Sequence, residues 1–109
     1  MKRAAFAFIA GMLFWSFLAG EMAAAASAER FKQSGMNKYM RKNYTGAVAD
    51  FDKYLAERPA DESVILLRGL AKSLQKPEDV TGACADFLLV KAGLQEMNLE
   101  TYCAGQPGW

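Results

Sequence analysis

A seven-residue stretch that occurs twice constrains the fold of this chain more than any other feature. Residues 45–51 read TGAVADF and residues 81–87 read TGACADF, so six of the seven letters recur at an offset of 36 residues. Periods of roughly 20 to 50 residues are typical of repeat arrays, and this one fits a helical hairpin. Each such unit is too small to bury its apolar face alone and stacks on a neighbour. The repeat therefore predicts an all-α fold that works through a surface.

The start of the chain has the layout of a secretory signal. Residues 2–3 are basic, residues 4–20 are apolar, and residues 26–28 place small side chains where signal peptidase requires them. We expect cleavage between Ala28 and Glu29. The remaining chain would then lie in a bacterial periplasm or an equivalent oxidising space.

An uncleaved membrane anchor is the alternative for residues 1–28. The apolar run at residues 4–20 reaches the lower limit for a spanning helix. Glu21 opposes a longer span, because a carboxylate is costly in hydrocarbon. The basic start stays on the cytoplasmic side in either case, so the rest of the chain faces the periplasm. In this alternative the chain is an accessory subunit of an inner-membrane protein complex.

The next part of the chain predicts a first helical hairpin. Apolar residues recur at spacings of three to five through residues 29–40 and again through residues 44–57, as on one face of an amphipathic helix. Lys42 and Asn43 interrupt the pattern between the two helices. Arg58 ends the second helix, because the residue before a proline is pushed out of the helical region.

A second hairpin and a cap follow. Asp61 is the expected N-cap of a third helix, and Pro77 is expected in the first turn of a fourth helix that ends at Gly93. A fifth helix at residues 95–103 is expected to cover the second hairpin, since a terminal repeat otherwise exposes an apolar face. Residues 105–109 form a flexible tail by composition, unless the terminal tryptophan folds back.

These units resemble the tetratricopeptide repeat, a helix-turn-helix unit of about 34 residues. The resemblance covers residues 28–93 and rests on Phe31, Gly35, Tyr44, Ala47, Phe51 and Pro59. It implies two tetratricopeptide-like hairpins and a C-terminal capping helix within residues 29–104. Their helices would meet along seams of small residues, at Gly35 and Ala47 in the first hairpin and at Gly69 and Ala83 in the second. Ser34 and Tyr54 depart from the family pattern.

The resemblance also implies that the first helix of each hairpin lines a concave face that contacts a protein partner. The candidate contact residues are Lys32, Met36, Tyr39, Met40, Leu66, Leu70 and Ser73. Methionine and tyrosine suit adaptable contacts. The alternative is that these side chains only fill the space between helices. Because two hairpins are fewer than the three that an array usually needs, we expect a protein partner or self-association.

Basic residues gather in the first helix. Residues 29–42 contain five basic side chains and one acidic one, and we call these five the basic ridge: Arg30, Lys32, Lys38, Arg41 and Lys42. Such a ridge is suited to an acidic segment or to a membrane surface. The alternative is an ordinary solvated helix face.

Cys84 and Cys103 are the only cysteines. An even pair in an exported domain indicates a disulfide. Closing a loop of roughly 20 residues would stabilise the fold by about 3 kcal/mol in the chain-entropy model. Two buried free thiols remain an alternative, and a redox role is disfavoured because there is neither a Cys-x-x-Cys spacing nor a histidine.

The sequence gives no indication of catalysis. It contains no histidine, no phosphate-binding glycine loop, no nucleophile motif and no metal-ligand spacing. Asp50 and Asp86 resemble an acid pair, but they are equivalent positions of the repeat, and repeat geometry explains them better. A net charge of +1 also disfavours nucleic-acid binding. We therefore expect no enzyme activity, no cofactor or metal, and no small-molecule substrate.

Overall fold

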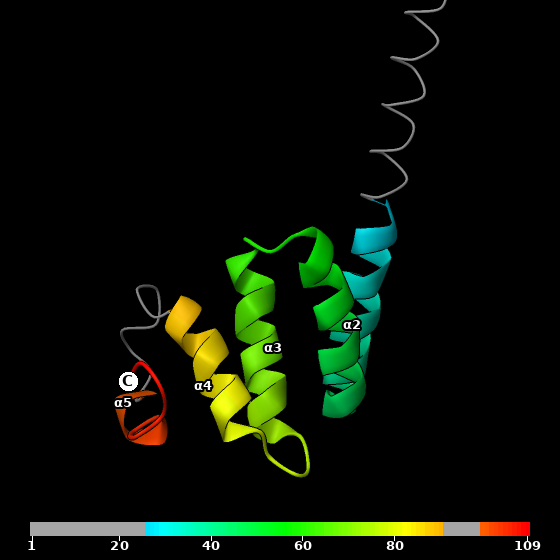
Figure 1. Cartoon of the computed structure of the whole chain (residues 1–109). Coiled ribbons are helices and arrows are strands. Elements are labelled where there is room, and N and C mark those ends of the chain that lie inside the picture. The colour runs from blue at the N-terminus through cyan, green and yellow to red at the C-terminus, as the bar shows by residue number, and fades with distance from the viewer. Residues whose placement is uncertain (1–25, 91–98) are drawn as a thin grey trace, which may run out of the picture.

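The computed structural model describes residues 26–90 and 99–109, and within these ranges all regular structure is helical. The helices are residues 26–40, α2 (Tyr44–Glu57), α3 (Glu62–Leu74), α4 (Val80–Leu89) and α5 (Leu99–Tyr102). Helix 26–40, α2, α3 and α4 alternate in direction along the molecule, with α5 beside α4 (Figure 1). The predicted all-α fold is confirmed. The predictions for residues 1–25, for Gly93 and for the start of the fifth helix lie outside the described residues.

Side-chain caps fix the starts of three helices. Asn43, Asp61 and Asp79 precede α2, α3 and α4, and each accepts a hydrogen bond from a backbone N–H in the first turn of its helix. These N–H groups have no partner within the helix, so each cap stabilises its helix by about 1 kcal/mol. Lys42 has φ of 65° and reverses the chain before α2. The predicted bounds of α2 and the predicted cap at Asp61 are confirmed.

The fourth helix differs from its predicted extent. The placement of Pro77 in its first turn was wrong, because Asp79 caps the helix and Val80 is its first residue. Pro77 instead lies in the connection between α3 and α4, where it follows a cis peptide bond. The helix ends at Leu89, with Val90 as its C-cap, which is earlier than predicted.

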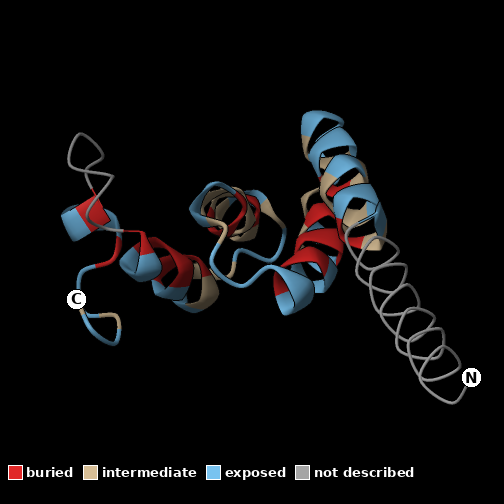
Figure 2. Ribbon diagram, turned by 90° about the horizontal axis from the view of Figure 1, so that it is seen from above, coloured by how far each residue is buried: buried red, intermediate tan, exposed pale blue. Residues whose placement is uncertain are grey.

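Two apolar clusters form the core (Figure 2). The first is formed by helix 26–40, α2, α3 and the C-cap of α4, and its buried members are Ala28, Ala47, Phe51, Tyr54, Leu55, Val64, Ile65, Ala71 and Val90. The second lies between α4 and the C-terminal segment, and its buried members are Ala83, Cys84, Phe87, Leu99 and Cys103. Leu66 packs against both clusters. The core is therefore continuous across the two hairpins.

The same contact closes both hairpins. A Cβ atom on Gly35 would lie 2.6 Å from the ring of Phe51, and a Cβ atom on Gly69 would lie 2.8 Å from the ring of Phe87. Both glycines and both phenylalanines are buried. Glycine inside a helix costs about 1 kcal/mol relative to alanine, and here the buried ring offsets that cost. With Ala47 and Ala83 also fully buried, the predicted small-residue seams are confirmed.

Candidate interaction surface

The repeated aspartates are buried and held by the first helix of their hairpin. Asp50 accepts a hydrogen bond of 2.6 Å from Ser34 Oγ and pairs with Lys38 Nζ at 2.9 Å. Burial raises the pKa of this carboxyl, but the hydrogen bonds from Ser34 and Lys38 outweigh it, so the net pKa lies below the ordinary value. Asp50 is therefore a charged structural group.

Asp86 occupies the same place in the second hairpin. Arg68 donates to it through two nitrogens, from Nη2 to Oδ1 at 2.7 Å and from Nε to Oδ2 at 2.9 Å. Lys72 Nζ lies 3.1 Å from Oδ2. Arg68 and Lys72 occupy the positions in the second hairpin that Ser34 and Lys38 occupy in the first. The two aspartates thus serve the same architecture, as the repeat predicts.

Arg68 also joins the two hairpins. Its Nη1 lies 3.0 Å from Asp52 Oδ1 on α2, while its other nitrogens hold Asp86 on α4. The hydrogen bond with Asp86 is the main reason that the pKa of Arg68 is raised. One guanidinium therefore links three consecutive helices, as its planar set of donors allows.

The glycine of the repeated stretch, Gly46 in α2 and Gly82 in α4, is explained by the helix cap beside it. A Cβ atom at Gly46 would lie 2.6 Å from Asn43 Nδ2, and one at Gly82 would overlap Asp79 Oδ2. Glycine at this position therefore leaves room for the capping side chain. The sequence interpretation missed these caps and the cations that hold the aspartates. The caps could have been found, because Asn43 and Asp79 are polar residues at equivalent positions of the two hairpins.

The candidate contact residues of the first hairpin are more open than those of the second. Met36 and Met40 are exposed, Met40 by 79%, and Tyr39 is half-buried with its ring 5.3 Å from that of Tyr44. Leu66 and Leu70 pack against the second cluster.

The two polar candidates have intramolecular contacts. Lys32 lies 3.7 Å from Asp61 and over the ring of Tyr54. Ser73 Oγ donates to the carbonyl of Leu70 at 2.7 Å. Their side chains therefore already contribute to the fold.

Lys32 belongs to a polar cluster where the two hairpins meet. Tyr54 Oη donates to Asp61 Oδ2 at 2.5 Å, and this hydrogen bond raises the pKa of Tyr54 to about 12. The pKa of Asp61 is lowered to about 2, first by the hydrogen bond from Ser63 and then by that from Tyr54. The Tyr54 hydroxyl therefore contributes to the junction of the two hairpins.

The basic ridge is partly neutralised. Lys32 pairs with Asp61 and Lys38 pairs with Asp50. Arg30, Arg41 and Lys42 are exposed. The free positive charge is thus concentrated toward the end of helix 26–40 and the turn that follows it.

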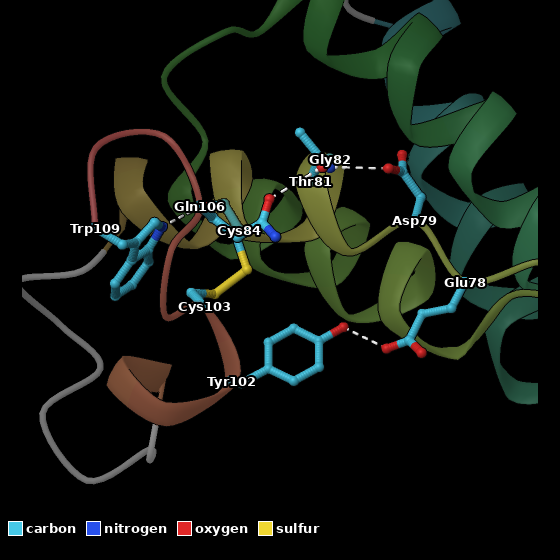
Figure 3. The surroundings of a disulfide bond; sticks show 9 residues. All are labelled: Glu78, Asp79, Thr81, Gly82, Cys84, Tyr102, Cys103, Gln106 and Trp109. Carbon is cyan, nitrogen blue, oxygen red and sulfur yellow. Dashed lines mark hydrogen bonds between the residues drawn. A yellow bond between two sulfur atoms is a disulfide. The ribbon is translucent and has the colours of Figure 1, made fainter.

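A disulfide bond ties the C-terminal segment to α4, as predicted (Figure 3). The sulfur atoms of Cys84 and Cys103 are 2.03 Å apart, and their Cα atoms are 5.7 Å apart. Both side chains are buried in the second cluster. The bridge therefore closes the core at this end of the molecule.

The final residues pack back on α4. Trp109 Nε1 donates to the carbonyl of Cys84 at 3.0 Å, and Thr81 Oγ1 donates to Gln106 Oε1 at 3.0 Å (Figure 3). Tyr102 Oη donates to Glu78, and burial together with this bond raises the pKa of Tyr102 to about 12. The tryptophan of the tail at residues 105–109 therefore folds back on α4, which was the alternative to a flexible tail.

The expected signal cleavage site meets the fold at Ala28. This residue is only 1% exposed and belongs to the first cluster, whereas Glu29 is exposed. Cleavage between them would remove one small buried side chain from the core. Within residues 26–90 and 99–109, no helix has the length and apolar content to cross a bilayer.

The described part of the chain also has no cluster of three or more cysteine or carboxylate side chains placed to hold a metal ion. Comparison of the chain with protein-family models, with curated proteins and with solved structures finds no match.

Proposed function

We propose that this chain is an exported module of the tetratricopeptide type that binds a protein partner and has no catalytic activity. The observation that carries the proposal is the repeated Gly–Phe seam, at Gly35 with Phe51 and at Gly69 with Phe87. Hairpins that pack in this way build extended surfaces, and the repeat architecture uses such surfaces for binding.

The surface proposed for the partner is the exposed side of helix 26–40. Met36 and Met40 lie there without the covering that Leu66 and Leu70 have in the second hairpin. Methionine side chains adapt to partner surfaces at little cost. A protein partner, or a second copy of the chain, would bury them.

Substitution of Met36 tests this proposal. Met36→Glu places a charge on the proposed contact surface, and Asn37→Glu places the same charge on the exposed neighbouring position. We expect cross-linked complexes purified from the native source to be lost for Met36→Glu and retained for Asn37→Glu. Light scattering of the purified chain reports self-association separately. Equal retention of complexes by both variants, with a strictly monomeric chain, would contradict the proposal.

The intact mass tests the location. A chain that starts at Glu29, or within a few residues of it, supports an exported, processed module. A chain that retains Met1 supports the anchored accessory subunit instead. Both forms place the helical domain in the periplasm, so the binding experiment applies to either.

A further inference from the structure

The turns within the two hairpins lie at the same edge of the molecule (Figure 1). A hollow opens between them. Residues 42–45 line it from the first hairpin, and residues 74–76 line it from the second. Its volume is about 270 Å³. We call this surface, with Met40 beside it, the turn edge.

Apolar side chains are exposed on the turn edge at equivalent positions of the two hairpins. Leu74 lines the hollow and is 46% exposed, and its counterpart in the first hairpin, Met40, is 79% exposed. The half-buried ring of Tyr44 also lines the hollow. Tyr44 and Leu74 thus form an apolar spot among polar lining residues, and an aromatic ring beside a leucine can receive an anchoring side chain of a partner.

The charged residues that line this recess have one sign. Lys42 and Lys76 both line the hollow, both are exposed, and they too are counterparts in the two hairpins. No acidic side chain is among the lining residues. Among the described residues, the ion pairs of the fold involve neither lysine. Arg41 adds a further exposed positive charge next to Lys42.

We infer that the turn edge binds an acidic segment of the protein partner. An apolar side chain of that segment enters the recess between Tyr44 and Leu74, and carboxylates on either side pair with Lys42 and Lys76. The charge complementarity favours encounter with an acidic segment and disfavours a basic one. This inference rests on the proposed function, since it names the chemistry of the partner.

A membrane surface fits the turn edge less well than a peptide. A flat surface cannot fill a recess between two turns. Residue 26 also lies at the other end of helix 26–40, about 21 Å away at 1.5 Å per residue. An N-terminus held at the membrane therefore leaves the turn edge facing away from it.

Fluorescence anisotropy with a synthetic peptide tests the inference. The probe is a short fluorescein-labelled peptide of glutamates with two leucines spaced three residues apart. We expect saturable binding to the full-length exported chain, weaker at high salt because exposed charges are screened. Lys42→Glu with Lys76→Glu should weaken binding roughly tenfold, since two attractive pairs become repulsive. Leu74→Ser should weaken it about fivefold by removing apolar contact.

A matched double variant separates the turn edge from bulk charge. Arg30→Glu with Arg58→Glu makes the same change in net charge at the opposite end of the first hairpin, where both side chains are exposed. We expect this control to change the affinity less than about twofold at moderate salt. Circular dichroism of every variant establishes that it is folded.

Three results would overturn the inference: equal loss in the control and in the lysine variant, no loss for Leu74→Ser, or a probe with serines in place of leucines that binds as well. Stronger binding of the chain to anionic phospholipid vesicles than to the peptide would do the same. The experiments distinguish failure of this inference from failure of the proposed function. If only the inference fails, native complexes still depend on Met36, although the acidic peptide does not bind the turn edge.

Discussion

The first hairpin, formed by helix 26–40 and α2, and the second, formed by α3 and α4, share one internal design. Each buries a phenylalanine ring against a glycine of its first helix, and each buries an aspartate beside a lysine of that helix. These contacts explain why the letters of the repeat are nearly unchanged. The two hairpins differ instead at the residues that contact each other or the C-terminal segment.

One difference is what covers the second helix of each hairpin. α2 packs against α3, and Val48 packs against the first cluster. The equivalent position on α4 is Cys84, which is bonded to the short C-terminal segment. Among the described residues, this segment contains only the four-residue helix α5 and the turns that follow it. The disulfide and the folded-back Trp109 supply the attachment that α3 provides for the first hairpin.

Another difference is how each buried aspartate is neutralised. Asp50 has one lysine and one hydroxyl, whereas Asp86 has a bidentate arginine and a lysine. Arg68 also reaches Asp52 on the neighbouring hairpin, and Ser34 is too short for such a contact. The second hairpin thus gains a link to the first at a position where the first hairpin has only a serine.

The largest expected effect tests the shared design. Phe51→Ala and Phe87→Ala should each lower the free energy of unfolding by about 3–5 kcal/mol, because each ring is fully buried against a glycine. Urea unfolding followed by circular dichroism measures the loss. Leu89→Ala is the control on an exposed position of α4 and should change stability by less than about 0.5 kcal/mol. A large loss for only one phenylalanine would mean that the hairpins do not share the seam.

The next effect concerns the cover of the second hairpin. Cys84→Val with Cys103→Ala gives α4 the residue that α2 has at this position, but removes the bond. The free energy of unfolding should fall by about 3 kcal/mol, since the bridge closes a loop with a sequence separation of 19 residues. Chemical unfolding under oxidising conditions measures the difference. Wild-type stability in this variant would show that the apolar contacts alone hold the cap.

The sequence was sufficient for the hairpins because their determinants are local. Small residues, a phenylalanine and a proline at fixed spacings predict both seams, and an even cysteine pair predicts the disulfide. The predicted start of α4 is too early, because proline favours the first turn of a helix and Pro77 was therefore placed there. Asp79 determines the start instead, and its equivalence to Asn43, two residues before the repeated stretch in each hairpin, was available in the sequence.

Long-range pairings were not accessible in the same way. Nothing local to Asp86 indicates that Arg68 will reach it, or that the same arginine will also reach Asp52. Among the candidate contact residues, Met36 and Met40 are exposed, whereas Leu66 and Leu70 pack against the second cluster. The composition of the tail predicts a loop, and the hydrogen bond from Trp109 depends on a distant carbonyl.

Substitution of Arg68 should sharpen the comparison of the two aspartates. Arg68→Met leaves Asp86 buried with only Lys72, and we expect a loss of about 2–3 kcal/mol in the free energy of unfolding. Ser34→Ala removes one hydrogen bond from Asp50 but leaves Lys38, and should cost about 1 kcal/mol. Thermal and urea unfolding of both variants measure the ratio. Equal losses would show that Arg68 adds nothing beyond a single hydrogen bond.

The remaining expected effect depends on pH and lies at Asp61, where the two hairpins meet. The pKa of this carboxyl is about 2 in the fold and about 3.9 in an unfolded chain. A lowered pKa means that ionised Asp61 stabilises the fold above about pH 4 and that this contribution is lost as the pH falls toward 2.

Two substitutions separate the charge of Asp61 from its cap. Asp61→Asn retains a side-chain acceptor for the N–H of Val64, so at neutral pH it should cost less than Asp61→Ala, which loses the cap together with the charge. Because asparagine does not titrate, the stability of Asp61→Asn should fall less steeply than that of the wild type between about pH 4 and pH 2. Urea midpoints measured across this range give both slopes. Parallel slopes would mean that the hydrogen bonds from Ser63 and Tyr54 do not lower the pKa of Asp61, and the junction would then depend on the cap alone.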